Sequence, residues 1–454
     1  MSARRALVIG LARSGSALAR TLHGEGYQVT VVDRDDSPAL RERAGALPSD
    51  VDVRLGGYAP DVARGYDLVS PSPGVAWDAP ELDLARDAGI PVRSEIALVF
   101  ERCRGRIVGI TGTNGKTTTP SLVAAILQRA GRRVHLGGNI GVPMLDRLDH
   151  VQEDDWVVLE LSSFQIETVD APRCSVACVL NVTPDHLDRH GDFATYADIK
   201  RRVVRFATDA AVLGYDDPVT RDMAGSAQCP VRHFGLRLDG GDGTTVRGGE
   251  VVSVEGGAAV PVMRLSAIPL FGAHNVLNVL AATAVSRATG VAAPDIAAAV
   301  EGFHAVRHRL QTVAEHEGVL WVNDSKATNA ESAVMALQAF ATRPIVWIGG
   351  GKGAGTSSDA LVDAVVKHAR HAVLNGASAM ELDAALAQRN YGARSVVPGL
   401  RDAVARAGEI AQPGDVVLLA PGFKSFDQFR DFEERGDAFI ALVAEMTAPV
   451  EGRR

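Results

Sequence analysis

The sequence is poor in features that would assign it to a secreted, membrane or nucleic-acid-binding protein. It has 4 cysteines in 454 residues, too few for a disulfide framework, so we expect a reducing compartment, the cytoplasm. Cys174 and Cys178 lack a second pair at metal-binding spacing and are predicted to be buried structural thiols. No apolar run is long enough to span a bilayer. A net charge of −8 argues against nucleic acid or an anionic membrane as a partner.

A complete dinucleotide fingerprint is also missing. The N-terminal stretch RALVIGLARSGSALARTLHGEGYQVTVVDRD predicts a strand, a glycine turn, a helix and a second strand that ends at Asp33. The fingerprint needs three glycines, but Ala12 stands between Gly10 and Gly15. Because the middle glycine lets the backbone approach a pyrophosphate, its loss favours a Rossmann-like domain that grips a different nucleotide. The turn Ser72-Pro73-Gly74 after a later strand either faces a ligand or is only a turn.

The most informative stretch is RIVGITGTNGKTTTPS, which starts at Arg106. An apolar strand runs into a loop with Gly112, Gly115 and Lys116, and a helical pattern follows. Glycines let backbone N–H groups approach an anion, the helix N-terminus adds partial positive charge, and the lysine adds a point charge. Thr117 is placed to offer a hydroxyl to Mg²⁺. The first glycine of the strict P-loop pattern is replaced by an isoleucine, so we predict a variant phosphate loop that binds ATP.

Polar residues follow the next predicted strands of this central region. Glu160 ends the strand in DDWVVLELSSFQIE, a position where NTPases hold Mg²⁺. His186 belongs to a polar cluster after the strand in CSVACVLNVTPDH, which either is solvated or reaches the metal and phosphates. Lys200 lies in the middle of a helix predicted over residues 193–206, and a lone helix lysine is usually on the surface.

From about residue 305 the chain alternates strands and helices again, which predicts a second doubly wound sheet. Three strands of this region run into turns rich in functional groups: 323–329, 349–353 and 421–426. All three turns are expected along the carboxyl edge of one parallel sheet, where open α/β folds bind ligands.

The length and the 46 glycines fit three α/β domains. We predict an N-terminal Rossmann-like domain over residues 1–97, a central P-loop NTPase-like domain with a mostly parallel sheet over residues 98–305, and a C-terminal Rossmann-like domain over residues 306–454.

Taken together, these motifs resemble the Mur ligases, which build the peptide of bacterial cell-wall precursors. The resemblance covers nearly the whole chain and rests on ordered motifs: TGTNGKTTT, GGNIG, LELSSFQ, NVTPDHLDRHG, the YADIK lysine, GAHNVLN, HR, NDSKATN, GGGKG and FDQFRDFEERG. The last motif indicates the members that add D-glutamate to UDP-N-acetylmuramoyl-L-alanine. The implied enzyme is an ATP- and Mg²⁺-dependent ligase, acting through an acyl phosphate and expected to be a monomer.

The resemblance also implies roles for individual residues. The uridine substrate would contact Arg13, Ser14, Gly15, Asp33, Arg34, Ser72, Pro73, Gly74 and Asn139. ATP would contact Gly112, Thr113, Asn114, Gly115, Lys116, Thr117, Thr118, Asn275, Arg309 and Asp324. Thr117 and Glu160 would hold one Mg²⁺ and His186 a second, with Lys200 as a carbamylated ligand. Lys116, His186 and Lys200 would be the catalytic residues. The incoming glutamate would contact Thr328, Lys352, Ser425 and Phe432.

The sequence departs from the family pattern at three places. Ala12 replaces a commonly seen glycine, and Asp35 stands where a basic residue can help to bind the nucleotide. Gly422-Phe423-Lys424 replaces small residues before Ser425, which brings bulk and a second positive charge near the amino-acid pocket.

Three alternatives stay open at this point. One is a ligase of the same architecture that adds L-glutamate or another amino acid, or extends folate, although a folate enzyme would not need the first domain. A Rossmann oxidoreductase is the second, and a non-enzymatic nucleotide-gated binding protein is the third.

Overall fold

The computed structural model describes residues 4–304, 306–353 and 358–448. The chain divides into two compact units. One unit is drawn from Met1–Ile268 and Leu277–Glu301, and the other from Pro269–Val276 and Gly302–Arg454. Ala305, where a predicted domain boundary falls, lies outside the described residues.

The first unit begins with a parallel sheet of order β3-β2-β1-β4. Its strands are β1 (Arg5–Ile9), β2 (Gln28–Val32), β3 (Asp52–Arg54) and β4 (Leu68–Pro71). Its helices are α1 (Arg13–Gly24), α2 (Pro38–Gly45) and α3 (Pro80–Asp87), and α4 (Glu95–Arg102) leads to the next sheet. Successive side chains of β1 alternate between two hydrophobic clusters, one packed against α1 and the other against α3. Helices therefore cover both faces, which confirms the predicted Rossmann-like domain.

The second sheet of this unit has the order β13-β12-β11-β10-β9-β8-β5-β7-β6. Its strands are β5 (Arg106–Thr111), β6 (Val134–Gly138), β7 (Trp156–Glu160), β8 (Val176–Val179), β9 (Ala210–Gly214), β10 (Val231–Phe234), β11 (Gly243–Arg247), β12 (Glu250–Glu255) and β13 (Ala258–Arg264). Neighbouring strands from β6 to β11 are parallel, whereas β12 and β13 continue the sheet in antiparallel pairs. The apolar runs of β5, β7 and β8 are buried, as expected for central strands of a parallel sheet.

Helices and 3₁₀ turns connect these strands. They are α5 (Thr118–Arg129), η1 (Met144–His150), α6 (Ser163–Ile166), α7 (Leu187–His190), α8 (Phe193–Arg205), α9 (Pro218–Asp222), η2 (Met223–Ser226), η3 (Leu265–Ala267), α10 (Ala273–Ala288) and α11 (Ala293–Glu301). The polar residues that follow β5, β7 and β8 lie at one carboxyl edge, because these strands are parallel neighbours.

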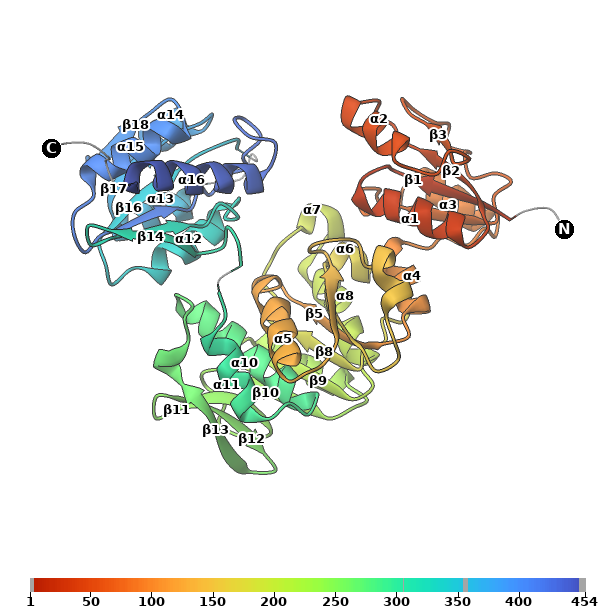
Figure 1. Cartoon of the computed structure of the whole chain (residues 1–454), viewed down its shortest axis with the longest axis horizontal. Helices are drawn as coiled ribbons and strands as arrows, with labels where there is room; N and C mark the ends of the chain where they lie inside the picture. The colour runs from red at the N-terminus through yellow and green to blue at the C-terminus, as the bar shows by residue number, and fades with distance from the viewer. Residues whose placement is uncertain (1–3, 305, 354–357, 449–454) are drawn as a thin grey trace. The chain divides into compact units, whose positions relative to one another are not determined.

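The second unit contains a six-stranded sheet of order β14-β15-β19-β16-β17-β18, parallel except for β14. Its strands are β14 (Gln311–His316), β15 (Val319–Asn323), β16 (Ile345–Gly349), β17 (Ala369–Leu374), β18 (Arg394–Val396) and β19 (Val416–Leu419). Its helices are α12 (Ala330–Ala339), α13 (Asp359–His368), α14 (Ala379–Gln388), α15 (Leu400–Ile410) and α16 (Phe432–Thr447). One cluster packs α12, α13 and α14 on one face, and another packs α15 and α16 on the other (Figure 1).

Strands β15, β19 and β16 are neighbours in this sheet, and each runs into one of the three polar turns. The predicted arrangement of the three turns along one carboxyl edge is therefore confirmed.

Two further expectations concern cysteine and the membrane. All four cysteines are free thiols, and Cys174 and Cys178 are fully buried, as predicted. Burial raises the pKa of Cys174 to about 12, so it is unreactive at neutral pH. Within residues 4–448 as far as they are described, every helix is too short or too polar to cross a bilayer.

Candidate active site

The loop between β5 and α5 has the geometry of a phosphate cradle. Gly112 and Gly115 have φ values of +155° and +84°, which favour glycine. A Cβ at Gly115 would lie 2.3 Å from the side-chain Oδ1 of Asn278. A Cβ at Gly112 would lie 2.9 Å from the Cβ of Leu180, so both glycines are required by conformation and by space. Thr117 and Thr118 are buried where α5 begins.

The chain after β8 holds this loop in place. The backbone N–H of Asn114 donates to Oδ1 of Asn181 at 2.8 Å, and Nδ2 of Asn181 donates to the Asn114 carbonyl at 3.1 Å. The Thr113 hydroxyl donates to the Thr183 carbonyl at 3.1 Å and accepts from the Thr183 N–H at 3.0 Å. Such clamping fixes the loop before any anion arrives, so binding needs little ordering of the backbone.

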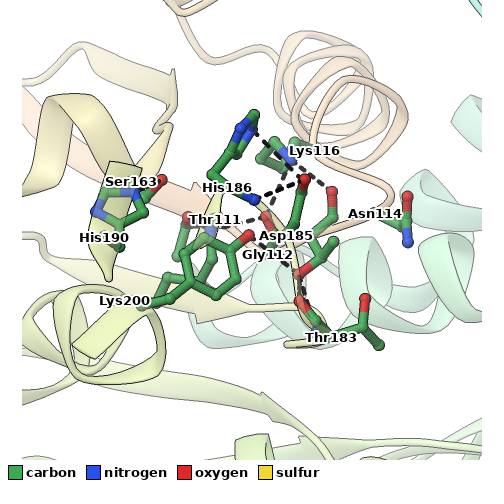
Figure 2. A network of polar contacts seen from close by, with 12 residues as sticks. Thr111, Gly112, Asn114, Lys116, Ser163, Thr183, Asp185, His186, His190 and Lys200 are labelled. Atoms are coloured by element: carbon green, nitrogen blue, oxygen red, sulfur yellow. Dashed lines mark hydrogen bonds and ion pairs between the residues drawn. The ribbon is translucent and has the colours of Figure 1, made fainter. Parts of the chain in front are cut away.

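Lys116 folds back over its own loop. Its Nζ donates to the carbonyls of Gly112 at 3.0 Å and Thr113 at 2.5 Å (Figure 2). The ammonium group is thus held against two carbonyl oxygens of the loop.

Glu160 stands at the end of β7, in register with Ile110 of β5. The side chain is 3% exposed, and its Oε1 accepts from Nδ2 of Asn139 at 3.1 Å. Its Oε2 is buried and has no hydrogen-bond partner among the described residues. A buried carboxylate oxygen without a partner is costly, and a hard cation such as Mg²⁺ would satisfy it. Asn139, expected at the uridine substrate, contacts this carboxylate.

Lys200 is buried, so the usual surface position of a lone helix lysine does not apply to it. The residue is 1% exposed, and its Nζ donates to the Gly112 carbonyl at 2.9 Å and lies 4.5 Å from the centre of the Tyr196 ring. Burial lowers the pKa of Lys200 well below its usual range, with a further contribution from the Lys116 ammonium. Burial thus makes the neutral form more accessible than it is for an exposed lysine.

Aromatic and polar contacts tie α7 and α8 to the loop. The Tyr196 hydroxyl lies 3.1 Å from the Thr113 hydroxyl, and the His190 ring lies 5.6 Å from the Tyr196 ring. His190 in turn lies within hydrogen-bond distance of the Ser163 hydroxyl, with Nε2 and Oγ 2.9 Å apart (Figure 2). The helix that carries Lys200 is therefore positioned relative to the phosphate loop.

His186 directly precedes α7 and has the left-handed φ of +53°. Its backbone N–H donates to Oδ1 of Asp185 at 2.9 Å, and its Nε2 lies 3.5 Å from Oδ2 of the same carboxylate. The ring is half-exposed and contacts Phe164, with ring centres 4.9 Å apart. In the described part of the chain, no three His, Cys, Asp or Glu side chains group to hold a metal ion. Any metal there would need phosphate, water or a modified lysine as further ligands.

The predicted uridine-site residues other than Asn139 lie at the carboxyl edge of the first sheet. Oδ2 of Asp33 accepts from the Leu11 N–H at 2.7 Å, and the Ser72 hydroxyl donates to the Gly10 carbonyl at 2.7 Å. A Cβ at Gly15 would lie 1.9 Å from that carbonyl, so α1 can approach β1 only through glycine. The predicted contacts at this edge that are exposed or half-exposed are Arg13, Ser14, Asp33, Arg34, Pro73 and Gly74. Arg34 forms an ion pair with Glu81 at 3.0 Å.

In the second unit, buried Arg435 connects the turns at the sheet edge. Its guanidinium donates to the hydroxyl and carbonyl of Ser325 at 3.0 and 2.9 Å and to the Phe423 carbonyl at 3.1 Å. Burial lowers the pKa of Arg435 to about 10, so the group stays charged at neutral pH. The turns after β15 and β19 are thereby fixed to one cation.

The predicted glutamate-site residues surround these turns. Ser425 is buried, Thr328 and Phe432 are half-buried, and Lys352 is exposed. The bulk expected from Phe423 is absent from the turn surface, because its side chain is 9% exposed and packs in the core beneath α12 and α13.

The remaining predicted ATP contacts also belong to the second unit. The Asn275 side chain donates to the Phe271 carbonyl at 2.7 Å. Asp324 is buried, and its Oδ1 accepts from the Leu310 N–H at 3.2 Å. Burial raises the pKa of Asp324 to about 6, although the charge of the half-buried Arg309 acts in the opposite direction.

Family models match the chain in three consecutive stretches. These are the Mur ligase MurD-like N-terminal domain over residues 4–94, the Mur ligase middle domain over residues 110–286, and the Mur ligase glutamate ligase domain over residues 308–423. A UDP-N-acetylmuramoylalanine--D-glutamate ligase of Koribacter versatilis (strain Ellin345) is 40% identical over 98% of both chains. One of Acidobacterium capsulatum is 41% identical over 98% of this chain and 96% of its own. This chain belongs to the Mur ligase family.

Solved Mur ligase structures share the fold at low sequence identity. The UDP-N-acetylmuramate-alanine ligase MurC from Thermotoga maritima superposes with a TM-score of 0.61 at 18% identity, over 97% of this chain and 99% of that one. A pseudomurein peptide ligase type C from Methanothermus fervidus gives a TM-score of 0.57 at 17% identity, over 98% and 100% of the two chains. The three-domain α/β fold expected from the Mur ligase resemblance is confirmed.

Sequence reasoning did not single out four residues that build the site. Asn181 and Thr183 clamp the phosphate loop, Tyr196 joins it to α8, and Arg435 joins the turns of the second unit. The motifs that contain them were recognisable, but not the roles of these side chains. For Asn181 and Thr183, the feature of the sequence that indicated a role was their position directly after a strand that neighbours β5.

Gly115→Ala should weaken nucleotide binding at least about tenfold, because the new Cβ meets Asn278 and the left-handed backbone is strained. Gly131→Ala is the matched control, since Gly131 has a φ of +75° and a Cβ added there would meet no atom within 4 Å. Titration with ATP measures both variants. Equal losses of ATP affinity in Gly115→Ala and Gly131→Ala would contradict the explanation by crowding at Gly115.

Asp324→Asn should change how folding stability depends on pH. Between about pH 4 and pH 6 the unfolded aspartate ionises while the buried one stays protonated, so the wild-type protein loses stability as pH rises. The variant lacks this loss, so its stability relative to wild type should rise by about 2 kcal/mol from pH 4 to pH 7. Urea unfolding at several pH values measures the free energy of unfolding of the variant and of wild type. Asp402→Asn, at an exposed site, is the control. A pH-independent difference would contradict the raised pKa.

Proposed function

We propose that this Mur ligase joins D-glutamate to UDP-N-acetylmuramoyl-L-alanine, with hydrolysis of ATP to ADP and phosphate, in the synthesis of peptidoglycan precursors. The observation that carries the proposal is a clamped phosphate loop in a chain about 40% identical, along nearly its whole length, to D-glutamate ligases. We further propose that the enzyme acts as a cytoplasmic monomer.

In the first step, a carboxylate oxygen of the substrate's terminal L-alanine attacks the γ-phosphorus of ATP. The P–O bond to ADP breaks, and an acyl phosphate forms. Charge spreads over the oxygens of the transferring group, and the Lys116 ammonium stabilises it electrostatically. Lys116 exchanges its carbonyl partners in the loop for phosphate oxygens. The loop N–H groups of residues 112–118 hold the other phosphates.

In the second step, the glutamate amine attacks the acyl carbon, phosphate leaves, and the nitrogen loses a proton to form the amide. Thr328, Lys352, Ser425 and Phe432 position the amino acid, and the Lys352 ammonium meets its side-chain carboxylate. No side chain needs to form a covalent intermediate, so positioning supplies most of the catalysis.

Mg²⁺ would supply charge neutralisation on the ATP phosphates when bound. Thr117 and Glu160 would hold one ion, and the unpartnered buried Oε2 of Glu160 supports this assignment. His186 and a carbamylated Lys200 would hold the second. An ammonium cannot ligate a metal, whereas a carbamate is an anionic oxygen ligand.

The remaining residues would orient the two nucleotides. Asn275, Arg309 and Asp324 would contact ATP. The uridine substrate would lie at the carboxyl edge of the first sheet, where Gly15 admits a close approach of backbone and α1. Its contacts would be Arg13, Ser14, Gly15, Asp33, Arg34, Ser72, Pro73 and Gly74, with Asn139 from the neighbouring sheet.

Phosphate release tests the proposal, with ATP, Mg²⁺ and UDP-N-acetylmuramoyl-L-alanine, and D-glutamate, L-glutamate or meso-diaminopimelate added in turn. We expect release with D-glutamate alone and a product heavier by one glutamyl residue. Lys116→Met should lower turnover by about a hundredfold or more, whereas Lys367→Met, at an exposed lysine in α13, should not. Phosphate release with L-glutamate only would contradict the stereochemical assignment. Full activity of Lys116→Met would contradict the proposed mechanism.

Lys200 should take up CO₂ as a carbamate, because only a neutral amine reacts and burial favours the neutral form. With ¹³C-labelled bicarbonate, ¹³C NMR should show one carbamate resonance in the wild-type enzyme. Lys200→Arg cannot form it and should lose the resonance together with most of the activity. Lys367→Arg is the control. A resonance that survives in Lys200→Arg, or an active enzyme without one, would refute the assignment.

A further inference from the structure

Two lysines from different turns stand directly opposite each other at the sheet edge of the second unit. The Lys352 N–H donates to the Lys424 carbonyl at 2.8 Å, and the Lys424 N–H donates to the Lys352 carbonyl at 3.2 Å. They form an isolated antiparallel bridge. In such a pair the Cα atoms are about 5.5 Å apart and the side chains leave from the same face. The two ammonium groups can therefore reach one ligand.

The backbone that carries Lys424 is firmly held. On one side, Phe423 anchors its side chain in the core and its carbonyl to Arg435. On the other, Ser425 is 2% exposed. A Cβ at Gly351 would lie 2.4 Å from the Lys424 carbonyl, so the turns pack too closely for any other residue there. The packing of the two turns therefore fixes Lys352 and Lys424 opposite each other.

The pair carries a charge that the protein does not neutralise. Like charges opposite each other across a bridge are destabilising. Both lysines are exposed, and no carboxylate among the described residues pairs with either. The carboxylate of Asp427, three residues beyond Lys424, accepts from the Ala377 N–H at 2.9 Å instead. An arrangement that is unfavourable alone becomes favourable when an anion binds between the two groups.

We propose that Lys424 acts with Lys352 as a specificity-determining residue, and that the two ammonium groups together hold the side-chain carboxylate of the incoming amino acid. This inference rests on the proposed function, since it refines where glutamate binds. A carboxylate has two oxygens, so each lysine can donate to one of them. Glutamine has the same shape without the charge, and the pair would reject it because the repulsion between the lysines would persist.

The test is steady-state ligation by the full-length enzyme with D-glutamate or D-glutamine as the amino acid. Lys424→Ala should raise the KM for D-glutamate about tenfold, with little change in kcat or in the KM for ATP. The preference for D-glutamate over D-glutamine should fall by the same factor, and Lys424→Arg should restore most of it. The thermal midpoint of Lys424→Ala should equal or exceed that of wild type, since a repulsion is removed.

Lys367→Ala, at an exposed lysine of the same unit, is the control and should match wild type in every measurement. A D-glutamate KM within about twofold of wild type in Lys424→Ala would overturn the inference. So would an equal loss for D-glutamate and D-glutamine, because the lost contact would not be with the side-chain carboxylate. Failure of the wild-type enzyme to use D-glutamate would instead overturn the proposed function, and it would be seen before any variant is compared.

Discussion

The hydrogen bonds between the phosphate loop and the chain after β8 are the constraint on which the rest of the site depends. Two glycines make the loop conformation accessible, and Asn181 and Thr183 select it from the conformations that glycine allows. The clamp works because β8 is the direct neighbour of β5 in the sheet. Strand order therefore decides which side chains can hold the loop, and the anion site exists before a nucleotide binds.

The electrostatics of the site follow from the same loop. The Gly112 carbonyl accepts from both Lys116 and Lys200, so two amines meet at one oxygen. Two full positive charges there would repel each other in a region with little water. Burial and the Lys116 charge lower the pKa of Lys200 well below its usual range. The surroundings of the two lysines therefore differ, since Lys116 is half-buried and Lys200 is 1% exposed, although both belong to the same residue type.

The positions of the strands, the phosphate loop and the three turns could be predicted from sequence, because they depend on local periodicity and on turn residues. The burial of Lys200 could have been recognised as well. The buried residues of α8 are Tyr196, Ala197, Lys200, Val203 and Val204, and this helical stripe contains the lysine. The roles of Asn181 and Arg435 could not be predicted, since each contacts residues that only the order of strands or the folding back of α16 brings near. The position of the Phe423 side chain was predicted wrongly for a related reason. Its place in the sequence indicated the amino-acid pocket, but the side chain points into the core.

In the second unit, as at the phosphate loop, hydrogen bonds from a side chain fix the backbone of the site, but here the side chain is the buried guanidinium of Arg435. Its three turns come from neighbouring parallel strands, yet parallel strands alone would leave the turns free to move apart. Arg435 joins two of them, and the bridge between Lys352 and Lys424 joins the third. A buried guanidinium with four hydrogen bonds to Ser325 and Phe423 holds the turns, whereas the two lysines of the bridge are exposed. The positive charge that fixes the backbone is therefore separate from the positive charge available to a ligand. A substitution at the exposed lysines can change what binds without loosening the turns that present them.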